Sequence, residues 1–328
     1  MMTSSISVVI PTYNRVDLIG ETLAAIRAQT LAPVEIIVVD DGSTDETPAW
    51  LAEHAGDVRA IRVSNGGDLV ARNTGLAAAT ADLVAFCDSD DLWQPDYLAA
   101  MVALWDGAPH LVAAYGDFVT VRDGRWGSDS KFAAAPASFW DGMRDWGEAG
   151  GIFDVPIAER LVAYQPFFPS ALIARRDFLN TVGGWDAAVS RIVGTDFATA
   201  LRITAHAPIG VLHRPLVGIR KHAGNFSADV QVMNLGDSLI LEHALRTNPY
   251  LATHAALVRS SIVARRRAAL DTAFARGDLA AVQTISSLLG PALNRAGQVK
   301  TAVARMPSPL ARIVSRALLT AGSLRAMF

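Results

Sequence analysis

Three aspartates stand within four residues of one another, directly after a short apolar run. The run Val84–Cys87 leads into Asp88, Asp90 and Asp91. Carboxylates this close repel one another and stay ionised together only where a cation or solvent offsets their charge, and oxygen ligands suit a hard ion such as Mg²⁺ or Mn²⁺. The alternative is a solvated acidic turn in which Asp91 or Asp96 caps the next helix. The stretch therefore indicates either a divalent-metal site or a helix entry.

The acidic stretch follows the last of four strand-like runs, each of which leads through a polar loop into a helical pattern. The runs cover residues 6–10, 35–39, 58–63 and 83–87. Continuously apolar strands that alternate with helices predict an α/β fold with a parallel sheet covered on both faces. Such sheets bind ligands beyond the carboxyl ends of their strands, so the polar loops should converge at one edge. Those loops carry Thr12, Asp41, Gly66 and Asp88.

The pattern changes twice along the rest of the chain. Residues 117–160 lack clear periodicity, which predicts long loops or an excursion beside the sheet. Residues 209–212 and 216–220 have the composition of two short strands, which would form a hairpin or an edge pair. From about Val232 the sequence is almost wholly helical, so we expect a first domain over residues 1–230 and a helical region over residues 231–328.

Composition and cysteine content bound the class of protein. With 328 residues, 51% of them apolar, the chain can hold a large core and two domains. Cys87 is the single cysteine and has no partner for an intramolecular disulfide, which favours a reducing compartment. We find neither a leader pattern at the start nor a run of about 18 apolar residues, so we expect a cytoplasmic protein.

The net charge of −3 hides an asymmetry between the two ends of the chain. From Arg259 onward there are eleven Lys or Arg residues against Asp271 and Asp278, a net charge of +9, which leaves −12 for the first 258 residues. Apolar residues recur at helical spacing between these arginines, most clearly from Leu310 to Leu324. Such a basic amphipathic stretch predicts peripheral contact with an anionic membrane, packing on the first domain, or a contact within a homodimer.

Several classes of nucleotide site and hydrolase are not supported, because their motifs are missing. The chain has no G-x-x-x-x-G-K-[ST] for a P-loop, no G-x-G-x-x-G after the first strand and no G-x-S-x-G. It does offer loop carboxylates, an arginine at a helix start (Arg72) and the glycine pair Gly66-Gly67. These groups suit a nucleoside diphosphate that a divalent ion bridges to carboxylates.

Four motifs stand in the order and spacing of glycosyltransferase family 2, and residues 5–225 resemble the GT-A fold of that family. The motifs are Val9–Arg15, Val38–Asp45, Ala71–Gly75 and Phe86–Asp91. The resemblance implies a Rossmann-like, mostly parallel sheet with helices on both faces. It also implies a GT-A catalytic domain over residues 1–230, with a donor half at about 1–116 and an acceptor half at about 117–230.

The activity that this resemblance implies is an inverting sugar transfer. The donor would be a nucleotide-sugar, usually UDP-linked, and the acceptor a hydroxyl of a glycan or lipid-linked glycan in bacterial surface polysaccharide synthesis. The Q-x-x-R-W motif of processive members is missing, which favours transfer of single sugars. A nucleotidyltransferase and a non-catalytic sugar-nucleotide or glycan-binding module are the alternatives, although Pro11–Arg15 lacks the glycine that a triphosphate loop normally needs.

The resemblance also implies roles for single residues. Asp88 and Asp90 correspond to the D-x-D of the family, with Asp90 the direct ligand of Mn²⁺ or Mg²⁺ and Asp88 nearer ribose and metal. His222, in the segment Arg220-x-His222-x-x-Asn225-x-Ser227, would approach the metal or the diphosphate. Asp196 matches the aspartate that deprotonates the acceptor, although Thr195 stands where the family usually has glutamate.

The remaining candidates would bind the donor or the acceptor sugar. Asp41 matches the carboxylate that accepts a hydrogen bond from the base. Trp185, after Gly183-Gly184, would either stack on an acceptor sugar or belong to the core. Simple helix caps and solvated helix faces are the alternative roles for these side chains. The implied donor-binding residues are Pro11, Thr12, Tyr13, Asn14, Arg15, Asp41, Gly66, Arg72, Asp88 and Ser89.

Overall fold

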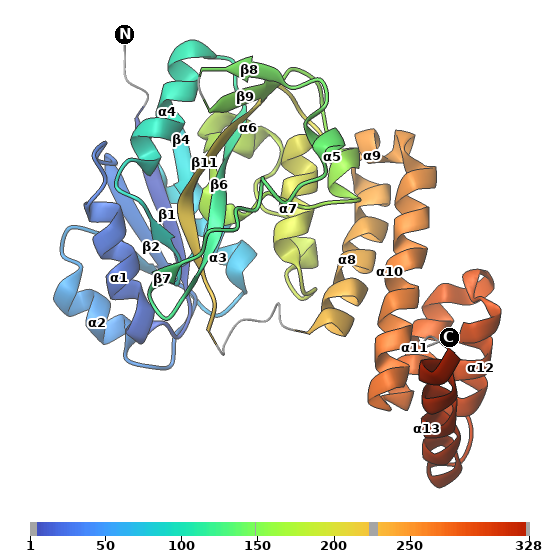
Figure 1. Ribbon diagram of the computed structural model, residues 1–328. Helices are drawn as coiled ribbons and strands as arrows, with labels where there is room; N and C mark the ends of the chain where they lie inside the picture. Colours follow the sequence, from blue (N-terminus) through green and yellow to red (C-terminus); the bar gives the residue numbers. More distant parts are fainter. Residues whose placement is uncertain (1–4, 148, 223–228, 326–328) are drawn as a thin grey trace. The chain divides into compact units, whose positions relative to one another are not determined.

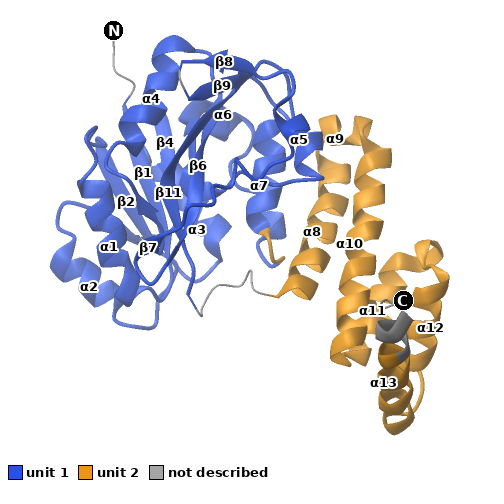
Figure 2. Ribbon diagram, in the orientation of Figure 1, with its two compact units in different colours: residues 1–191, 195–225 blue, residues 192–194, 226–328 orange. Residues whose placement is uncertain are grey.

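The computed structural model describes residues 5–147, 149–222 and 229–325, with side chains as far as residue 320. The chain forms two compact units, which Figure 2 colours separately. The first comprises residues 1–191 and 195–225, and the second comprises residues 192–194 and 226–328. Each unit has a hydrophobic core of its own.

A mixed sheet forms the centre of the first unit and contains eleven strands within the described residues (Figure 1). The strands are β1 Ile6–Thr12, β2 Glu35–Asp40, β3 Arg59–Arg62, β4 Leu83–Phe86, β5 Leu92–Trp93, β6 Ala113–Arg122, β7 Arg125–Trp126, β8 Arg144–Trp146, β9 Gly150–Phe153, β10 Leu172–Arg175 and β11 Ile209–Arg220. Their main order is β3-β2-β1-β4-β10-β6-β11-β9-β8, with β5 paired to β11 and β7 paired to β6. Because β3, β2, β1 and β4 are parallel neighbours, the expected α/β fold is confirmed.

Helices cover both faces of this sheet. Those of the first unit are α1 Val16–Arg27, α2 Thr47–His54, α3 Asp68–Ala78, α4 Tyr97–Gly107, α5 Ala158–Leu161, α6 Arg176–Thr181 and α7 Thr195–Thr204. Short 3₁₀ turns occupy η1 Ala137–Trp140, η2 Pro169–Ala171 and η3 Ala187–Val189. Alternate residues of β1 point to opposite faces, so Val8 and Ile10 pack with Ile19 and Leu23 of α1, whereas Val9 lies against α3.

Helix α3 approaches β1 closely because it carries a glycine at the contact. A Cβ atom at Gly75 would lie 2.2 Å from the Val9 side chain, a distance that real side chains do not adopt. Any larger residue at this position would push α3 away from the sheet. The close approach fixes the helix that carries Arg72.

The expected hairpin near the end of the first domain is wrong. Residues Ile209–Arg220 form one long strand, β11, which runs parallel to β6 along its length. Register shifts between Leu212 and Val217 mark a bulge, and the exposed Pro215 lies within it. The polar residues that indicated a turn therefore bend a continuous strand instead of ending it. The weakly periodic segment before it contains the short strands β7, β8 and β9 as well as loops.

The second unit is helical within the described residues. It contains α8 Val230–Thr247, α9 Pro249–Thr253, α10 Ala255–Arg276, α11 Leu279–Leu289, the 3₁₀ turn η5 Gly290–Ala292, α12 Arg295–Ala304 and α13 Ser308–Arg325. Side-chain caps start four of these helices, from Asp229, Asn248, Asp278 and Asn294. The described helices include none that combines the length and the hydropathy needed to cross a bilayer.

Candidate active site

The loops that follow β1, β2 and β4 meet at one edge of the sheet, since β1 lies between the other two strands and runs parallel to both. Asn14 joins the first two loops. Its backbone N–H donates to Ser43 Oγ at 2.9 Å, and its Oδ1 accepts from the backbone N–H of Thr44 at 2.8 Å. Asn14 has a φ of 52°, a left-handed conformation that asparagine tolerates well. The predicted convergence of these loops is thus present in the structure.

Asp91 holds the acidic loop in place. Its Oδ2 accepts a hydrogen bond from Ser170 Oγ at 2.5 Å, and its Oδ1 accepts from the backbone N–H of Arg220 at 3.0 Å. Ser170 Oγ in turn accepts from the backbone N–H of Asp88 at 3.0 Å. Both carboxylate oxygens of Asp91 accept hydrogen bonds, and only 4% of the residue is exposed, so Asp91 fixes the conformation of the loop from within the protein.

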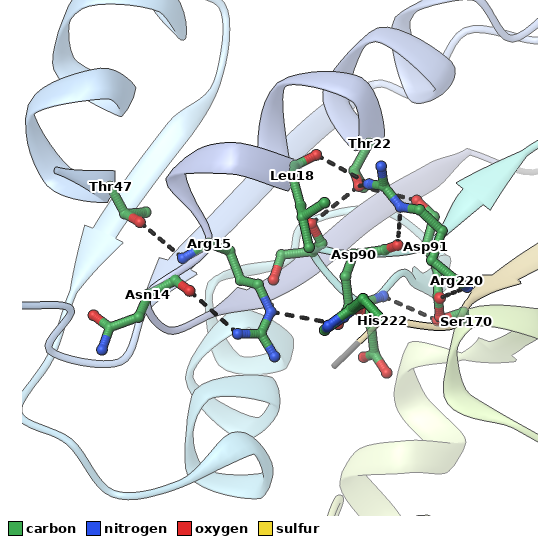
Figure 3. A network of polar contacts seen from close by, with 12 residues as sticks. Asn14, Arg15, Leu18, Thr22, Thr47, Asp90, Asp91, Ser170, Arg220 and His222 are labelled. Atoms are coloured by element: carbon green, nitrogen blue, oxygen red, sulfur yellow. Dashed lines mark hydrogen bonds and ion pairs between the residues drawn. The ribbon is translucent and has the colours of Figure 1, made fainter. Parts of the chain in front are cut away.

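The side chain of Arg220 ties the same loop to α1 (Figure 3). Its guanidinium donates to the backbone carbonyl of Asp90 through Nε and to Glu21 Oε2 at 2.6 Å through Nη1. The Nη2 atom donates to the carbonyl of Leu18 and to Thr22 Oγ1, both at 3.0 Å. Five donors on a planar group allow one buried side chain to satisfy all of these acceptors.

Asp90 projects from this anchored loop toward two positively charged or polar side chains (Figure 3). His222 Nε2 lies 3.0 Å from Asp90 Oδ2, and Arg15 Nε lies 3.4 Å from the same oxygen. The loops after β1, β4 and β11 therefore each contribute one of the three side chains. Asn225 and Ser227, which continue the predicted histidine segment, lie outside the described residues.

Arg72 brings carboxylates from three elements around one buried guanidinium. Its Nη1 lies 2.5 Å from Asp68 Oδ2, and its Nη2 lies 2.6 Å from Asp88 Oδ1. Asp196 Oδ1, at the start of α7, lies 3.9 Å from Nη1. The ring of Trp185 lies 4.6 Å from the guanidinium carbon, as in a cation–π pair. The acidic loop and the predicted base therefore share one cation.

This arrangement shifts the acid strength of the carboxyl groups. Burial raises the pKa of Asp196 to about 7; the Arg72 guanidinium opposes the shift, and the neighbouring carboxylates add to it. Burial also raises the pKa of Asp88, against the effect of Arg72. The pKa of Asp91 is raised well above its usual range, because the group is buried and two aspartates stand beside it. Acids with displaced pKa values beside one another are typical of functional sites.

The acidic cluster fits a hard divalent cation. One carboxylate oxygen each from Asp88, Asp90 and Asp91 lies within 4.8 Å of the others. Asp91 is committed to the loop, whereas the side chains of Asp88 and Asp90 keep 30% and 16% of their surface exposed. Carboxylate oxygens match the ligand preferences of Mn²⁺ and Mg²⁺. Asp88 and Asp90 are thus the residues that would hold such an ion, and His222 would lie next to it.

The remaining predicted donor-binding residues lie in these loops and differ in how deeply they are buried. Asp41 is buried, and its two oxygens accept hydrogen bonds from the backbone N–H groups of Gly66 and Gly67, each at 2.8 Å. It therefore fixes the glycine loop, which brings two of the predicted residues together. Pro11, Thr12 and Ser89 are also buried. Tyr13 is 43% exposed, so its ring is open to a planar ligand.

Trp185 belongs to the core and does not present its ring to an acceptor. It is 1% exposed, packs edge-on against Phe86 at a centroid distance of 5.0 Å and covers Arg72. Asn73, next to Arg72 on α3, clamps it: Asn73 Nδ2 donates to the Trp185 carbonyl at 2.7 Å, and Asn73 Oδ1 accepts from its N–H at 2.8 Å. Gly184 is required there, because a Cβ would lie 2.4 Å from Asn73 Oδ1.

Three residues of the site were not predicted from the sequence. Asp68 faces Arg72 at a spacing of four residues along α3, a pattern that would have indicated an ion pair. Ser170 and Glu21 carry no local pattern that marks them. They meet Asp91 and Arg220, respectively, only because the strands bring distant segments together.

A sheet whose central strands are parallel, with a D-x-D loop at its carboxyl edge and an aspartate from a later helix beside it, defines a GT-A fold of the glycosyltransferase type. Residues 7–151 match the family model described as glycosyl transferase family 2. The match covers less than half of the chain and lies within the first unit.

Relatives and solved structures agree with this assignment. YwdF of Bacillus subtilis (strain 168), named as an uncharacterized glycosyltransferase, is 29% identical over 195 residues, which is 58% of this chain and 66% of YwdF. ExoW of Rhizobium meliloti (strain 1021), named as a succinoglycan biosynthesis protein, is 41% identical over 102 residues, which is 29% of this chain and 32% of ExoW. The matched region thus spans only about a third of the length of ExoW.

A crystal structure of residues 1–349 of S. aureus TarS in complex with UDP-GlcNAc has the same fold. Its TM-score is 0.60 at 20% identity, and the match covers 97% of this chain and 92% of that chain. The likeness supports the GT-A fold of the first unit, and the aligned part also includes most of the helical region.

Proposed function

We propose that this protein is an inverting, metal-dependent glycosyltransferase that takes a sugar from a UDP-linked donor. The acceptor is a hydroxyl of a glycan or lipid-linked glycan, in the synthesis of a bacterial surface polysaccharide. The main support is the position of Arg72, which places Asp88 of the D-x-D loop and Asp196 around one guanidinium, at 2.6 and 3.9 Å. The names of ExoW and of the TarS complex with UDP-GlcNAc are in accord with this chemistry.

Asp196 acts as the base in this proposal. A carboxylate whose pKa is about 7 accepts a proton efficiently near neutral pH. The acceptor oxygen attacks the anomeric carbon and forms the new C–O bond, the bond between that carbon and the UDP oxygen breaks, and the acceptor proton passes to Asp196. A single displacement of this kind inverts the configuration at the anomeric carbon.

The residues of the donor loops hold and orient the nucleotide. Asp88 and Asp90 would hold Mn²⁺ or Mg²⁺, which when bound neutralises charge on the diphosphate leaving group. His222 and Arg15 lie against Asp90 and point to the same region. The exposed Tyr13 offers its ring to the nucleobase of the donor. We assign the catalytic domain to residues 1–230, with the donor half at about 1–116 and the acceptor half at about 117–230.

UDP together with Mn²⁺ should stabilise the fold. A ligand that binds only the native state raises the free energy of unfolding by about 2.7 kcal/mol at a hundred times its Kd, which is roughly 5–10 °C in the melting temperature of a domain of this size. The check is thermal melting with UDP alone, with UDP and Mn²⁺, and with EDTA added. If no nucleoside diphosphate shifts the melting temperature in the presence of metal, the donor site is not where we place it.

We further propose that the helical region, residues 231–328, rests on an anionic membrane through α13. The chain from residue 279 onward contains six Lys or Arg residues and no Asp or Glu. Ala311 and Ser315 pack inward, whereas Leu310 and Ile313 are 49% and 67% exposed. A basic, partly apolar helix surface suits the negatively charged cytoplasmic leaflet, so we place the contact at the inner face of the cell membrane.

Vesicle sedimentation tests this contact. The protein should bind vesicles that contain phosphatidylglycerol and not those of phosphatidylcholine alone. Reversing both exposed arginines, Arg312→Glu with Arg316→Glu, should weaken binding at least roughly 30-fold, since each arginine contributes about 1 kcal/mol. The control is Arg122→Glu with Arg125→Glu, the same charge change on the β6–β7 turn. Equal binding to both kinds of vesicle would contradict the proposal. Self-association that these α13 changes abolish would assign the surface to a homodimer.

A further inference from the structure

The acidic side chain that approaches Arg72 most closely is not part of the donor loop or the predicted base. Asp68, the first residue of α3, accepts a hydrogen bond from Arg72 Nη1 on its Oδ2 at 2.5 Å. The same oxygen accepts a second hydrogen bond from Thr195 Oγ1 at 3.1 Å. Asp68 is therefore connected at once to the guanidinium and to the residue that precedes Asp196.

Asp68 holds the Nη1 atom of Arg72 away from Asp196. Nη1 lies 3.9 Å from Asp196 Oδ1, which is beyond hydrogen-bonding distance, while Asp68 Oδ2 lies at 2.5 Å. The Trp185 ring covers one face of the guanidinium, and Asp88 holds Nη2 at 2.6 Å. Asp68 and Asp88 thus hold the two terminal nitrogens of the planar guanidinium, and Nη1 stays out of reach of Asp196.

A direct hydrogen bond from Arg72 would weaken Asp196 as a base. It would occupy a lone pair that the acceptor hydroxyl needs, and an arginine in contact with an aspartate favours its ionised, unprotonated form. Asp68 prevents this by holding Nη1 in its own hydrogen bond, 3.9 Å from Asp196 Oδ1. The hydroxyl of Thr195 fixes the Asp68 carboxylate relative to the start of α7.

We propose, on the basis of the function proposed above, that Asp68 is a positioning residue. It keeps Arg72 from forming a direct hydrogen bond to the catalytic Asp196. Thr195, which stands where family 2 usually has a glutamate, donates its hydroxyl hydrogen bond to this carboxylate. The acidic group beside the base is thus delivered from α3 instead of from the residue before Asp196.

Asp68→Asn tests the inference, because asparagine keeps the shape and removes the charge. We expect kcat to fall roughly 10-fold to 100-fold, with the KM for the UDP-sugar little changed. A crystal structure of the variant should show the Arg72 Nη1 to Asp196 Oδ1 distance reduced from 3.9 Å to about 3 Å. Adding Thr195→Glu to this variant should restore much of kcat, since it returns a carboxylate to the same place from α7.

The matched control is Asp177→Asn, which also removes an aspartate from the first turn of a helix, α6, where it pairs with Arg175 of β10 at 3.0 Å. It should leave kcat unchanged. An unchanged kcat in Asp68→Asn, or an unchanged distance in its crystal structure, would overturn the inference, and so would a parallel loss of UDP binding and thermal stability. If the wild-type protein transfers no sugar, the proposed function fails, and the distance measurement still decides the role of Asp68.

Discussion

Replacing Asp196 by asparagine should lower the turnover number for sugar transfer by roughly 10²–10⁴-fold, with little change in the affinity for UDP and Mn²⁺. Asparagine preserves the size of the side chain at the start of α7, but its amide does not take a proton from an acceptor hydroxyl. The D-x-D loop, by contrast, keeps its anchors on Ser170 and Arg220. The measurement is kcat with a glycan acceptor, together with the Kd for UDP.

The control for this substitution is Asp17→Asn, at an exposed aspartate in the first turn of α1. It removes the same charge from a helix start but lies outside the cluster around Arg72. If Asp196→Asn and Asp17→Asn are equally active, Asp196 is not the base. The protein would then have to be treated as a sugar-nucleotide or glycan-binding module.

The same assignment fixes the direction of the pH dependence. Burial raises the pKa of Asp196 to about 7, opposed by Arg72 and supported by the carboxylates around it. Only the ionised form accepts a proton, so kcat should be lost as the pH falls through about 7 and should level off above it. In the Asp196→Asn variant this acid limb should be missing from the residual activity.

Asp90→Asn should remove the metal-dependent part of nucleotide binding. Asp90 offers an oxygen beside Asp88 and lies against His222 and Arg15, so its loss removes one of the two partly buried carboxylates that would hold the ion. We expect the stabilisation by UDP with Mn²⁺ to fall from about 2.7 kcal/mol at a hundred times Kd to the value seen with EDTA. Isothermal titration with Mn²⁺ and UDP measures the loss directly.

Asp91→Asn provides the contrast, because the neighbouring carboxylate serves the fold. Asparagine cannot replace both acceptor oxygens that Ser170 and the Arg220 N–H use, so the free energy of unfolding without ligand should drop by roughly 1–3 kcal/mol. Metal-dependent UDP binding should persist at temperatures where the variant is folded. Should Asp90→Asn bind UDP and Mn²⁺ like the wild type, the acidic loop is a structural turn and no metal site.

The loops at the carboxyl edge of the sheet were predictable because each depends on a few consecutive residues. A β-branched run, a polar loop and a helical pattern recur at short spacing, and parallel strands of this kind place their loops at a common edge. The convergence of Asn14 with Ser43, and the α/β fold itself, follow from such local signals.

The anchors of the site were not predictable, because they depend on contacts across the chain. Asp91 meets Arg220 over 129 residues and Ser170 over 79 residues. Arg220 stands in the segment that resembles the family, but nothing local pairs it with Asp91, and Ser170 carries no pattern that marks it. Thr195 reaches Asp68 over 127 residues. The predicted hairpin over residues 209–220 was wrong for a different reason. Polar residues and Pro215 normally indicate a turn, but β11 pairs with β6 on both sides of the bulge, so the strand continues.

The anchoring of the acidic loop by Arg220 has a consequence for synthesis of the chain on the ribosome. Asp90 and Asp91 leave the exit tunnel long before the residue that secures them, which comes about 130 positions later. A nascent chain that has released only its first half therefore has the D-x-D aspartates without a fixed loop. A gene fragment that ends at residue 151, where the family match stops, would encode those aspartates but neither Ser170 nor Arg220. The acidic loop thus gains its anchor only when β11 is available to pair between β6 and β9.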